Sequence, residues 1–505
     1  MFKHELPFQA APSTSSTDSS PDSFNIPSSD LACIIKDLSK EPILGNVNLH
    51  CARPPGRSTE HSSAKAGHLV FDAMFESGNL ASVASINPCE YDLYLRPDTC
   101  NPRQRLWFYF SVGNVLKDQK VIFNIVNFSK VKSLYSDGMA PLVRSTSRTK
   151  WQRIPPRHVH YYRSIDHDRN FVMSFAFAFD SPDDTYYFAY CYPYTYSLLQ
   201  QFLTECEKAK KPCFSRDLLG LTVQHRSLDL ITITEPSNQN LASDQVQQII
   251  LISARVHPGE TPASIICEGL IKFLLSDNAI AQKLRETYVF KIVPMLNSDG
   301  VYLGNYRCSL LGFDLNRQWK TPSIWAHPTI YAIKKLMLDY DSDSEVNVVY
   351  YIDIHAHSTK LGAFMYGNVF GSDFSRLRRQ AVLPSLFAEL ADDFSLENTE
   401  FNTDPGKEGT GRRTMGSCLS KNTLCYTLEV SFYGYESQRE RVFYPYTYKA
   451  YSKLGENLAK SFHSALLAED PRRSVDLPPI EFIDQSKSKK AAAYGIRFKA
   501  PPDSD

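Results

Sequence analysis

The chain has no run of about 20 apolar residues, so it lacks the stretch that a membrane-spanning helix needs. Its first residues, M-F-K-H-E-L-P-F, also lack the apolar core of a secretory signal peptide. The eleven cysteines include no C-x-x-C pair and are scattered without pattern from Cys33 to Cys425. This cysteine usage indicates reduced cytosolic thiols rather than disulfides or a cysteine-bound metal.

Net charge is also missing. The 55 basic and 55 acidic side chains cancel, so no global field recruits nucleic acid or a membrane surface. What the chain does have is length and apolar material: 505 residues, 43% of them hydrophobic and 12% aromatic. A chain of this size can bury a substantial core and is expected to form two or three domains. Its specificity must therefore come from a local site.

Changes in composition divide the chain into four parts. Residues 1–67 begin with a Ser-, Thr-, Pro- and Asp-rich stretch and are expected to be a largely disordered tail. Residues 68–190 contain short aromatic and β-branched runs separated by turn signals, which predicts a small antiparallel β-sandwich. Residues 191–470 alternate strand-like and helical patterns, which predicts an α/β domain with a mostly parallel sheet covered on both faces. Residues 471–505 are Pro-, Lys- and Ser-rich, and a second disordered tail is expected there.

The most informative stretch is Q-I-I-L-I-S-A-R-V-H-P-G-E-T-P-A-S-I-I-C-E, residues 248–268. Its apolar run 249–254 is too short for a helix and predicts a buried parallel strand. The tight loop that follows presents His257 and Glu260. Thr261 is the expected N-cap of a helix that continues to about residue 275. A strand, a loop with two possible ligands and a helix are typical of a metal site at the carboxyl edge of an α/β sheet.

On its own, H-x-x-E is a weak signal, because an incidental surface ion pair would explain it as well. Much later in the chain, however, D-I-H-A-H-S places His355 at the end of the strand-like segment 346–354. His257, Glu260 and His355 together give two imidazoles and one carboxylate, with a fourth position left for water. This is the ligand set of a catalytic zinc site, whereas structural zinc sites usually use cysteine.

Further motifs make the pattern specific. They are H-P-G-E-T-P, N-x-D-G-V-x-x-G-N-Y-R-C-S, F-D-L-N-R-x-W, D-I-H-A-H-S and T-L-E-V-S-F-Y-G. With these motifs the chain resembles the M14 metallocarboxypeptidases, and within their subfamily B the cytosolic carboxypeptidases, also called ATP/GTP-binding protein-like. The segments R-S-T-S-R, C-Y-P-Y-T-Y and M-Y-G-N favour the short subgroup numbered six. The resemblance covers roughly 68–467 and implies the metallocarboxypeptidase fold, a mixed sheet flanked by helices.

The resemblance also implies roles for individual residues. One zinc ion per chain would be held by His257, Glu260 and His355. Glu429, at the end of the apolar strand 424–430, would take a proton from water and return it to the leaving amine. Arg307 would stabilise the negative charge that develops on the carbonyl oxygen. The alternative for Arg307 is a salt bridge on its turn, and a lone glutamate at a strand end would ordinarily be solvated.

Substrate recognition is implied at two places. Asn316 and Arg317, in F-D-L-N-R, would bind the terminal carboxylate of the substrate, because a planar guanidinium and an amide can hold it in two places. This clamp favours trimming of a C-terminus over internal cleavage. The basic, glycine-rich loop 406–416 lies where the family builds its side-chain pocket, and the family's known preference is glutamate. The candidate readers of that side chain are, in order of preference, Arg413, Arg412 and Lys407.

Two further points concern neighbours of these motifs. Asp353 and His357 flank His355 at strand spacing and share its face, so either could support a zinc ligand from behind. For His357, a hydrogen-bonded buried histidine is an equal alternative. The 406–416 loop does not have the G-x-x-x-x-G-K-[ST] pattern, so ATP or GTP binding receives no support from it.

The sequence therefore predicts a cytosolic zinc carboxypeptidase that removes glutamates from acidic protein tails, with polyglutamylated tubulin as the expected partner. Neither nucleic acid nor a membrane is an expected partner, and microtubules, centrioles and cilia are candidate locations. One alternative is a zinc amidohydrolase acting on small acylated amino acids. The other is a non-catalytic tubulin-binding module, against which the intact motif set argues. The motifs leave open whether glutamate chains are only shortened or also cut at the branch point, and whether aspartate is accepted.

Overall fold

The computed structural model describes residues 65–238, 245–370, 373–468, 481–483 and 497–499. The expected disordered tails, 1–67 and 471–505, lie mostly outside the described residues. Among the described residues, no helix combines the length and apolar composition that crossing a membrane requires. The nine cysteines in the described part of the chain are all free thiols.

The N-terminal part is built from two five-stranded sheets. One has the order β1 (Val70–Asp72), β4 (Tyr109–Gly113), β10 (Tyr186–Ala189), β6 (Leu142–Ser145) and β7 (Gln152–Arg153). The other has the order β2 (Ser82–Asn87), β3 (Glu90–Tyr94), β5 (Lys120–Ile125), β9 (Phe171–Ala178) and β8 (Val159–Arg163). Only the β3 and β5 pair is parallel among the pairs within these sheets. Phe110 and Phe188 of the first sheet contact Phe123 of the second, so aromatic rings form the core between the sheets.

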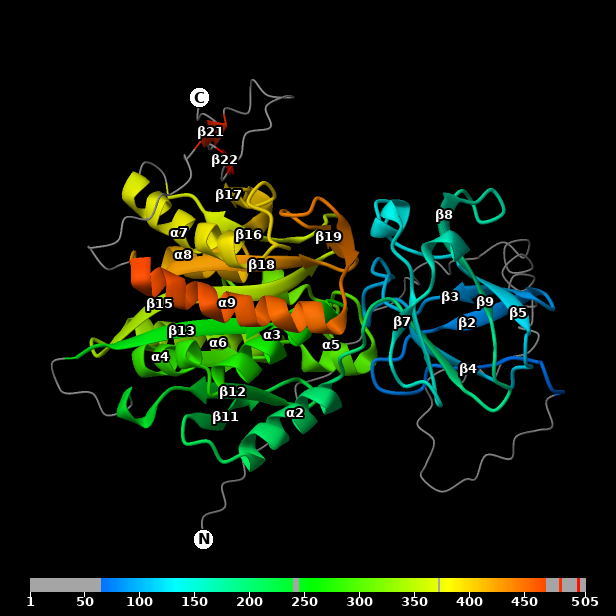
Figure 1. Ribbon diagram of the computed structural model, residues 1–505, viewed down its shortest axis with the longest axis horizontal. Helices are drawn as coiled ribbons and strands as arrows, with labels where there is room; N and C mark the ends of the chain where they lie inside the picture. Colours follow the sequence, from blue (N-terminus) through cyan, green and yellow to red (C-terminus); the bar gives the residue numbers. More distant parts are fainter. Residues whose placement is uncertain (1–64, 239–244, 371–372, 469–480, 484–496, 500–505) are drawn as a thin grey trace, which may run out of the picture. The chain divides into compact units, whose positions relative to one another are not determined.

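The C-terminal part contains one ten-stranded mixed sheet (Figure 1). Its order is β11 (Phe214–Leu221), β12 (Ser227–Ile233), β14 (Val289–Val293), β13 (Gln247–Ala254), β15 (Val346–His357), β18 (Leu424–Ser431), β16 (Ala363–Asn368), β17 (Glu400–Asn402), β22 (Arg497–Lys499) and β21 (Glu481–Ile483). The central strands β14, β13, β15 and β18 are parallel, while β12 and β16 run antiparallel to their neighbours in the centre. The fold is therefore the mostly parallel, helix-flanked sheet that was expected.

Helices pack on both faces of this sheet. Ile250 of β13 belongs to the core cluster of α3 (Thr261–Leu274) and α9 (Tyr448–Ala468). The next residue, Leu251, belongs to the cluster of α6 (Pro328–Asp341) and α8 (Gly411–Cys418). Neighbouring residues of a strand point to opposite faces, so an apolar strand such as β13 buries both of its faces. The other α-helices of the described residues are α2 (Tyr196–Lys208), α4 (Ala279–Thr287), α5 (Ser298–Leu303) and α7 (Phe374–Leu390).

Three local predictions are wrong. The N-cap of α3 is Glu260 rather than Thr261, which is the first helical residue. The strand expected at 346–354 continues to His357, so His355 lies inside β15 near its end. The loop expected at 406–416 gives way to helix α8 at Gly411, because Thr410 caps it by accepting a hydrogen bond from the Arg413 backbone N–H.

Candidate active site

The carboxyl ends of three neighbouring parallel strands bring the predicted zinc ligands together. His257 and Glu260 lie on the loop between β13 and α3, and His355 lies near the end of β15. Glu429 lies near the end of β18, in register with His355 on the adjacent strand. His257, Glu260 and His355 are all buried. Parallel strands end at one edge of a sheet, which explains how residues far apart in the sequence meet there.

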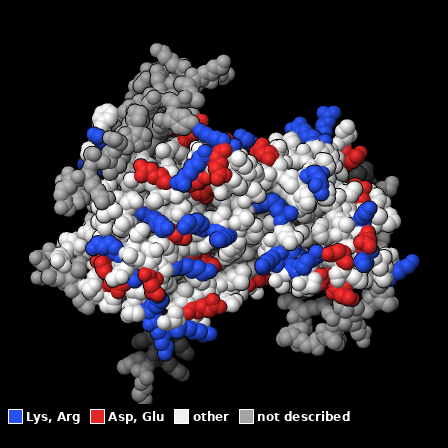
Figure 2. All heavy atoms as spheres, in the orientation of Figure 1, with Lys and Arg blue, Asp and Glu red and all other residues white. Residues whose placement is uncertain are grey.

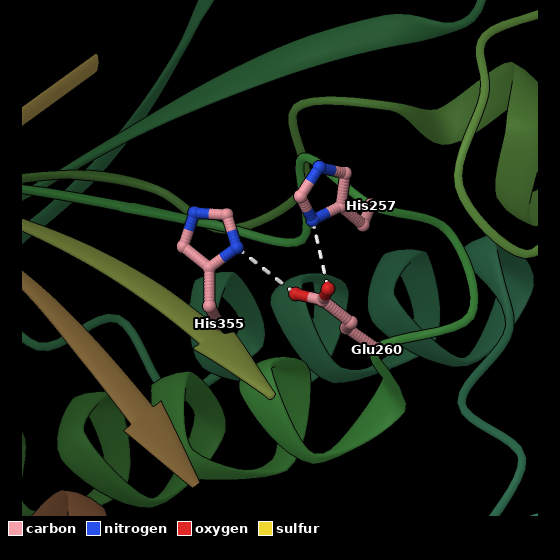
Figure 3. Close-up of side chains that lie close together, drawn as sticks. All are labelled: His257, Glu260 and His355. Carbon is pink, nitrogen blue, oxygen red and sulfur yellow. Dashed lines mark hydrogen bonds and ion pairs between the residues drawn. The ribbon is translucent and has the colours of Figure 1, made fainter. Parts of the chain in front are cut away.

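Both imidazoles face the Glu260 carboxylate through their Nδ1 atoms (Figure 3). His257 Nδ1 lies 2.7 Å from Oε1 and His355 Nδ1 lies 3.0 Å from Oε2. One ligand atom from each of the three residues lies within 4.8 Å of the other two. Two ring nitrogens and one carboxylate oxygen, with no thiol, fit a catalytic zinc ion.

A second carboxylate supports each imidazole from behind. His257 Nε2 lies 3.0 Å from Asp314 Oδ1, and His355 Nε2 lies 2.8 Å from Asp353 Oδ2. A carboxylate at this position places the ring proton on Nε2 and leaves the Nδ1 lone pair for a metal. Asp353 was one of the two neighbours singled out in the sequence. Asp314 was not assigned a role, although it lies within the F-D-L-N-R motif.

The carboxylates of the site differ in their proton affinity. Burial alone would raise the pKa of Glu260, but the facing His257 and His355 outweigh it and hold that pKa well below its usual range. In contrast, burial raises the pKa of Glu429 to about 7, because the nearby His355 only partly offsets the loss of solvent. The Glu429 carboxylate forms no hydrogen bond with any described residue. It is therefore suited to exchange a proton at neutral pH, whereas Glu260 is suited to bind a cation.

Arg307 forms the salt bridge that was the alternative for it, and it also lines the cavity above the triad. Its Nε and Nη2 lie 2.8 and 2.6 Å from Asp314 Oδ2, and its side chain still lines the cavity above the triad. Burial alone would lower the pKa of Arg307, but Asp314 and Glu260 keep that pKa above its usual value. The salt bridge thus orients a guanidinium that remains charged within reach of a bound substrate.

The loop that carries Arg307 is fixed by Asp98, from the N-terminal part of the chain. Asp98 accepts hydrogen bonds from the backbone N–H groups of Tyr306, Arg307 and Cys308, at 2.6 to 2.7 Å. No role was assigned to Asp98 from the sequence. The contact could not be inferred from spacing because the partners are more than two hundred residues apart.

Asn316 and Arg317 lie on a short 3-10 turn, Leu315–Arg317. Asn316 Oδ1 accepts a hydrogen bond of 3.0 Å from the Gly411 backbone N–H, and its Nδ2 lies 3.3 Å from His355 Nε2. Arg317 Nη1 donates to the Asn316 carbonyl at 2.9 Å, and about a third of its side chain is exposed. Asn316 therefore contacts a residue of the triad, and Arg317 lies against the Asn316 backbone.

A cavity of about 550 Å³ opens above the triad. It is lined by every predicted site residue except Arg413. Two lysines from the N-terminal part of the chain, Lys130 and Lys132, also line it. Lys130 Nζ donates to the Tyr306 hydroxyl and to Ser358 Oγ, both at 2.7 Å. The N-terminal part therefore contributes one wall of the site, which the motifs did not indicate.

The order of preference among the basic residues of 406–416 does not match their placement. Arg412 is buried beside the cavity, where its Nη1 donates to the Asn368 side chain at 2.7 Å. Arg413 instead donates to the Asn402 carbonyl at 2.8 Å and does not line the cavity. Both residues belong to the first turn of α8, where successive side chains point in different directions. Arg412 and Lys407 are therefore better placed than Arg413 to contact a substrate.

A buried arginine that no sequence motif indicated holds the loop of His257 and Glu260. Arg255 Nε donates to the Pro258 carbonyl at 2.7 Å, and its Nη1 donates to Ser264 Oγ at 2.9 Å. Burial lowers its pKa to about 9. Arg255 also has a φ of 60°, which is rarely adopted by non-glycine residues. Such a conformation next to a site is consistent with a loop held in one required shape.

Two protein-family models match the chain. The zinc carboxypeptidase model matches residues 199–371, and the cytosolic carboxypeptidase N-terminal domain model matches residues 71–191. Human cytosolic carboxypeptidase 6 is 55% identical over 462 residues, which cover 92% of this chain and 90% of that protein. The chain belongs to the cytosolic carboxypeptidase family. The Caenorhabditis elegans cytosolic carboxypeptidase 6 is 52% identical over 419 residues, 81% of this chain and 90% of that protein.

Solved structures agree on the fold. A metallo-carboxypeptidase from Burkholderia cenocepacia has a TM-score of 0.66 at 22% identity, and the match covers 79% of this chain and 100% of that protein's chain. A metallo-carboxypeptidase from Pseudomonas aeruginosa, in complex with (2-guanidinoethylmercapto)succinic acid, has a TM-score of 0.63 at 21% identity. This match covers 78% of this chain and 98% of that protein's chain. Membership of the cytosolic carboxypeptidases and the triad geometry together identify this chain as a zinc metallocarboxypeptidase.

Proposed function

We propose that this cytosolic carboxypeptidase removes glutamates from acidic protein tails, with polyglutamylated tubulin as its main substrate. One zinc ion per chain is held by His257, Glu260 and His355. A cytosolic location at microtubules, centrioles or cilia follows from that substrate.

The charge of the catalytic cavity is the observation that carries this proposal. Besides the triad and Glu429, its lining contains two acidic side chains, Glu400 and Asp404. The six basic side chains of the lining are Lys130, Lys132, Arg307, Arg317, Lys407 and Arg412. A cavity with this excess of cations favours a substrate whose end and side chains are negatively charged.

The reaction follows from the residues around the triad. When bound, zinc acts as a Lewis acid that makes water a nucleophile near neutral pH. Glu429, with its pKa raised to about 7 by burial, accepts a proton from the attacking water and returns it to the leaving amine. Arg307, oriented by Asp314, donates hydrogen bonds to the carbonyl oxygen as negative charge develops there.

Two further contacts select the substrate. Asn316 and Arg317 bind the terminal carboxylate, which restricts cleavage to the last residue of a chain. Arg412, with Lys407, binds the side-chain carboxylate of that residue. Burial lowers the pKa of Arg412 to about 10, so its guanidinium is still charged at neutral pH. A desolvated cation of this kind discriminates strongly between glutamate and its neutral analogue, because the neutral side chain would leave the cation unpaired.

The proposal is tested with purified, zinc-loaded protein and a polyglutamylated peptide. The wild-type protein should release free glutamate, and it should release little glutamine from the matching Gln-ended peptide. Glu429→Gln should lower kcat by roughly 10²- to 10⁴-fold while bound zinc stays at one ion per chain, because only the proton carrier is lost. The exposed Glu389→Gln serves as a matched control and should keep wild-type activity.

Three results would count against the proposal. Glutamate release at the wild-type rate by Glu429→Gln would remove this residue from the mechanism. Equal turnover of the Glu-ended and Gln-ended peptides would refute the acidic specificity. The absence of turnover in zinc-loaded wild-type protein would refute the proposed substrate.

A further inference from the structure

A second cavity, of about 460 Å³, adjoins the catalytic cavity on the N-terminal part of the chain. Its charged lining is entirely basic and consists of Arg103, Arg105, Lys130, Arg163 and Arg169. Neither a family motif nor the catalytic chemistry described above involves the four arginines. We call this cavity, defined by the five cations, the basic cavity.

The floor of the basic cavity is fixed by short contacts. The Arg105 backbone N–H donates to Ser129 Oγ at 3.0 Å, and the Ser129 backbone N–H donates to the Arg105 carbonyl at 2.9 Å. The Tyr161 hydroxyl donates to the Lys130 carbonyl at 2.8 Å, and its ring stacks on Phe171 at 5.1 Å. The cavity is therefore built from three chain segments that are tied to one another.

The loop that carries Arg169 is also anchored. The Asn170 N–H donates to the His167 carbonyl at 2.8 Å, and Asp168 and Arg169 between them have φ values of 52° and 59°. Two such residues in succession match a type I′ turn, which usually takes Asn, Asp or Gly. His167 fixes the turn, because its Nε2 lies 2.7 Å from Asp92 Oδ2. Arg169 is thus held at the rim by a defined turn.

The cations of the basic cavity are not neutralised locally. Within the described residues, none of the five forms an ion pair with a carboxylate. Arg163 instead lies over the Phe171 ring at 5.1 Å, and Arg103, Arg163 and Arg169 are exposed. Figure 2 shows acidic and basic side chains interspersed over the face it displays. A hollow lined by charges of one sign concentrates its field and attracts anions.

The two cavities share part of their wall. Lys130 and Val131 line both of them, and Lys130 Nζ is directed to Tyr306 and Ser358 on the catalytic side. A polypeptide that enters the catalytic cavity at its end can therefore continue into the basic cavity without leaving the protein surface.

We propose that the basic cavity is an exosite that binds the acidic residues of a substrate tail upstream of the end being cleaved. The proposal deepens the proposed function, since it rests on the substrate being an acidic tail. Phe128 and Phe171 in the lining suit a polypeptide, because they offer apolar contact to the chain between its carboxylates.

The experiment compares zinc-loaded protein on three Glu-ended substrates: a blocked dipeptide, a long peptide with acidic upstream residues, and a long peptide with neutral upstream residues. The test variant combines Arg103→Glu, Arg163→Glu and Arg169→Glu. The control variant combines Lys117→Glu, Lys120→Glu and Lys150→Glu. The control makes the same charge change at exposed positions of the same part of the chain that line neither cavity.

The test variant should lower kcat/KM for the long acidic peptide roughly tenfold, through a higher KM. The reason is that the exposed charges proposed to attract the carboxylates of the substrate tail would then repel them. The preference for this peptide over the dipeptide should fall by the same factor. Added salt should weaken the wild-type preference and leave the variant almost unaffected. Arg169→Gly, which keeps the turn because glycine adopts positive φ freely, should produce a smaller loss in the same direction.

The exosite is overturned if the test and control variants lose the same activity, or if the dipeptide is affected as strongly as the long acidic peptide. It is also overturned if a single-stranded oligonucleotide of equal charge competes better than the acidic peptide for binding. Wild-type protein that cleaves all three substrates with equal efficiency refutes the exosite but not the proposed function. Wild-type protein that prefers to bind the acidic peptide yet releases no glutamate refutes the proposed function but not the exosite.

Discussion

Replacing Asp314 by asparagine should weaken zinc binding and catalysis together, because one carboxylate joins the zinc site to two arginines. Asp314 Oδ1 lies 3.0 Å from His257 Nε2, while Oδ2 lies 2.6 Å from Arg307 Nη2 and 4.0 Å from Arg317 Nη1. Burial opposes ionisation of Asp314, but His257 and then Arg307 hold its pKa well below the usual range. Asparagine keeps the size of the side chain and removes this charge.

The expected magnitude has two parts. Loss of the carboxylate behind a metal-binding histidine typically costs 10- to 100-fold in metal affinity, about 1.4 to 2.8 kcal/mol. The arginines also lose their counterion. The side chains of Asp314 and Arg307 are 20% and 25% exposed. Their pairing is therefore worth more than a surface ion pair and less than a buried one, or about 1 to 3 kcal/mol.

The assay measures zinc affinity by competition with a chelator, and kcat at saturating zinc. Asp353→Asn should weaken zinc binding by a similar factor through His355, but it should leave Arg307 in place. Only Asp314→Asn should therefore also lower kcat once zinc saturates the site. The exposed Asp183→Asn is the matched control. Zinc affinity of Asp314→Asn within twofold of wild type would show that this carboxylate does not support His257.

Two other substitutions probe the framework behind the site. Burial raises the pKa of Asp393 from 3.8 to about 6, so the folded state binds its proton more tightly than the unfolded state does. The resulting stability is present at low pH and is lost as pH rises through 6. In urea unfolding, the free energy of unfolding of the wild-type protein should fall by about 2 kcal/mol relative to that of Asp393→Asn between pH 4 and 8. Parallel pH profiles of the two free energies would contradict this. In Gly411→Ala, the new Cβ would lie 2.8 Å from the buried Tyr351 hydroxyl, which should cost about 1 to 3 kcal/mol of stability and lower the melting temperature. Gly113→Ala, whose nearest contact is 3.7 Å, is the control, and equal melting temperatures for the two variants would argue against the clash.

The central strands of the C-terminal sheet could be predicted from the sequence because they are apolar on both faces. The predicted segments 249–254 and 424–430 lie within β13 and β18 as the structure has them. Element ends were less predictable. Thr261 was misassigned as an N-cap because the Glu260 side chain, which occupies that position, is directed to two histidines rather than to the helix backbone.

The residues that hold the site together could not be predicted. Asp98 and Lys130 lie in the N-terminal part of the chain, far in sequence from the loops that they contact. Arg412 and Arg413 are adjacent, basic and equivalent by spacing, and only the start of α8 at Gly411 decides which one lines the cavity. These contacts depend on how two halves of the chain pack, for which local sequence carries no periodic signal.

The sequence by itself determined the chemistry, because side-chain types at strand ends are fixed by the order of residues and parallel strands must end at a common edge. His257, Glu260 and His355 could be assigned to one place for that reason, and the family resemblance added Glu429. The tertiary structure decided what surrounds that chemistry: the carboxylates behind the imidazoles, the wall contributed by Lys130, and the basic cavity beyond it. Those features arise from contacts between distant segments, whose distances are set only when the whole core is packed.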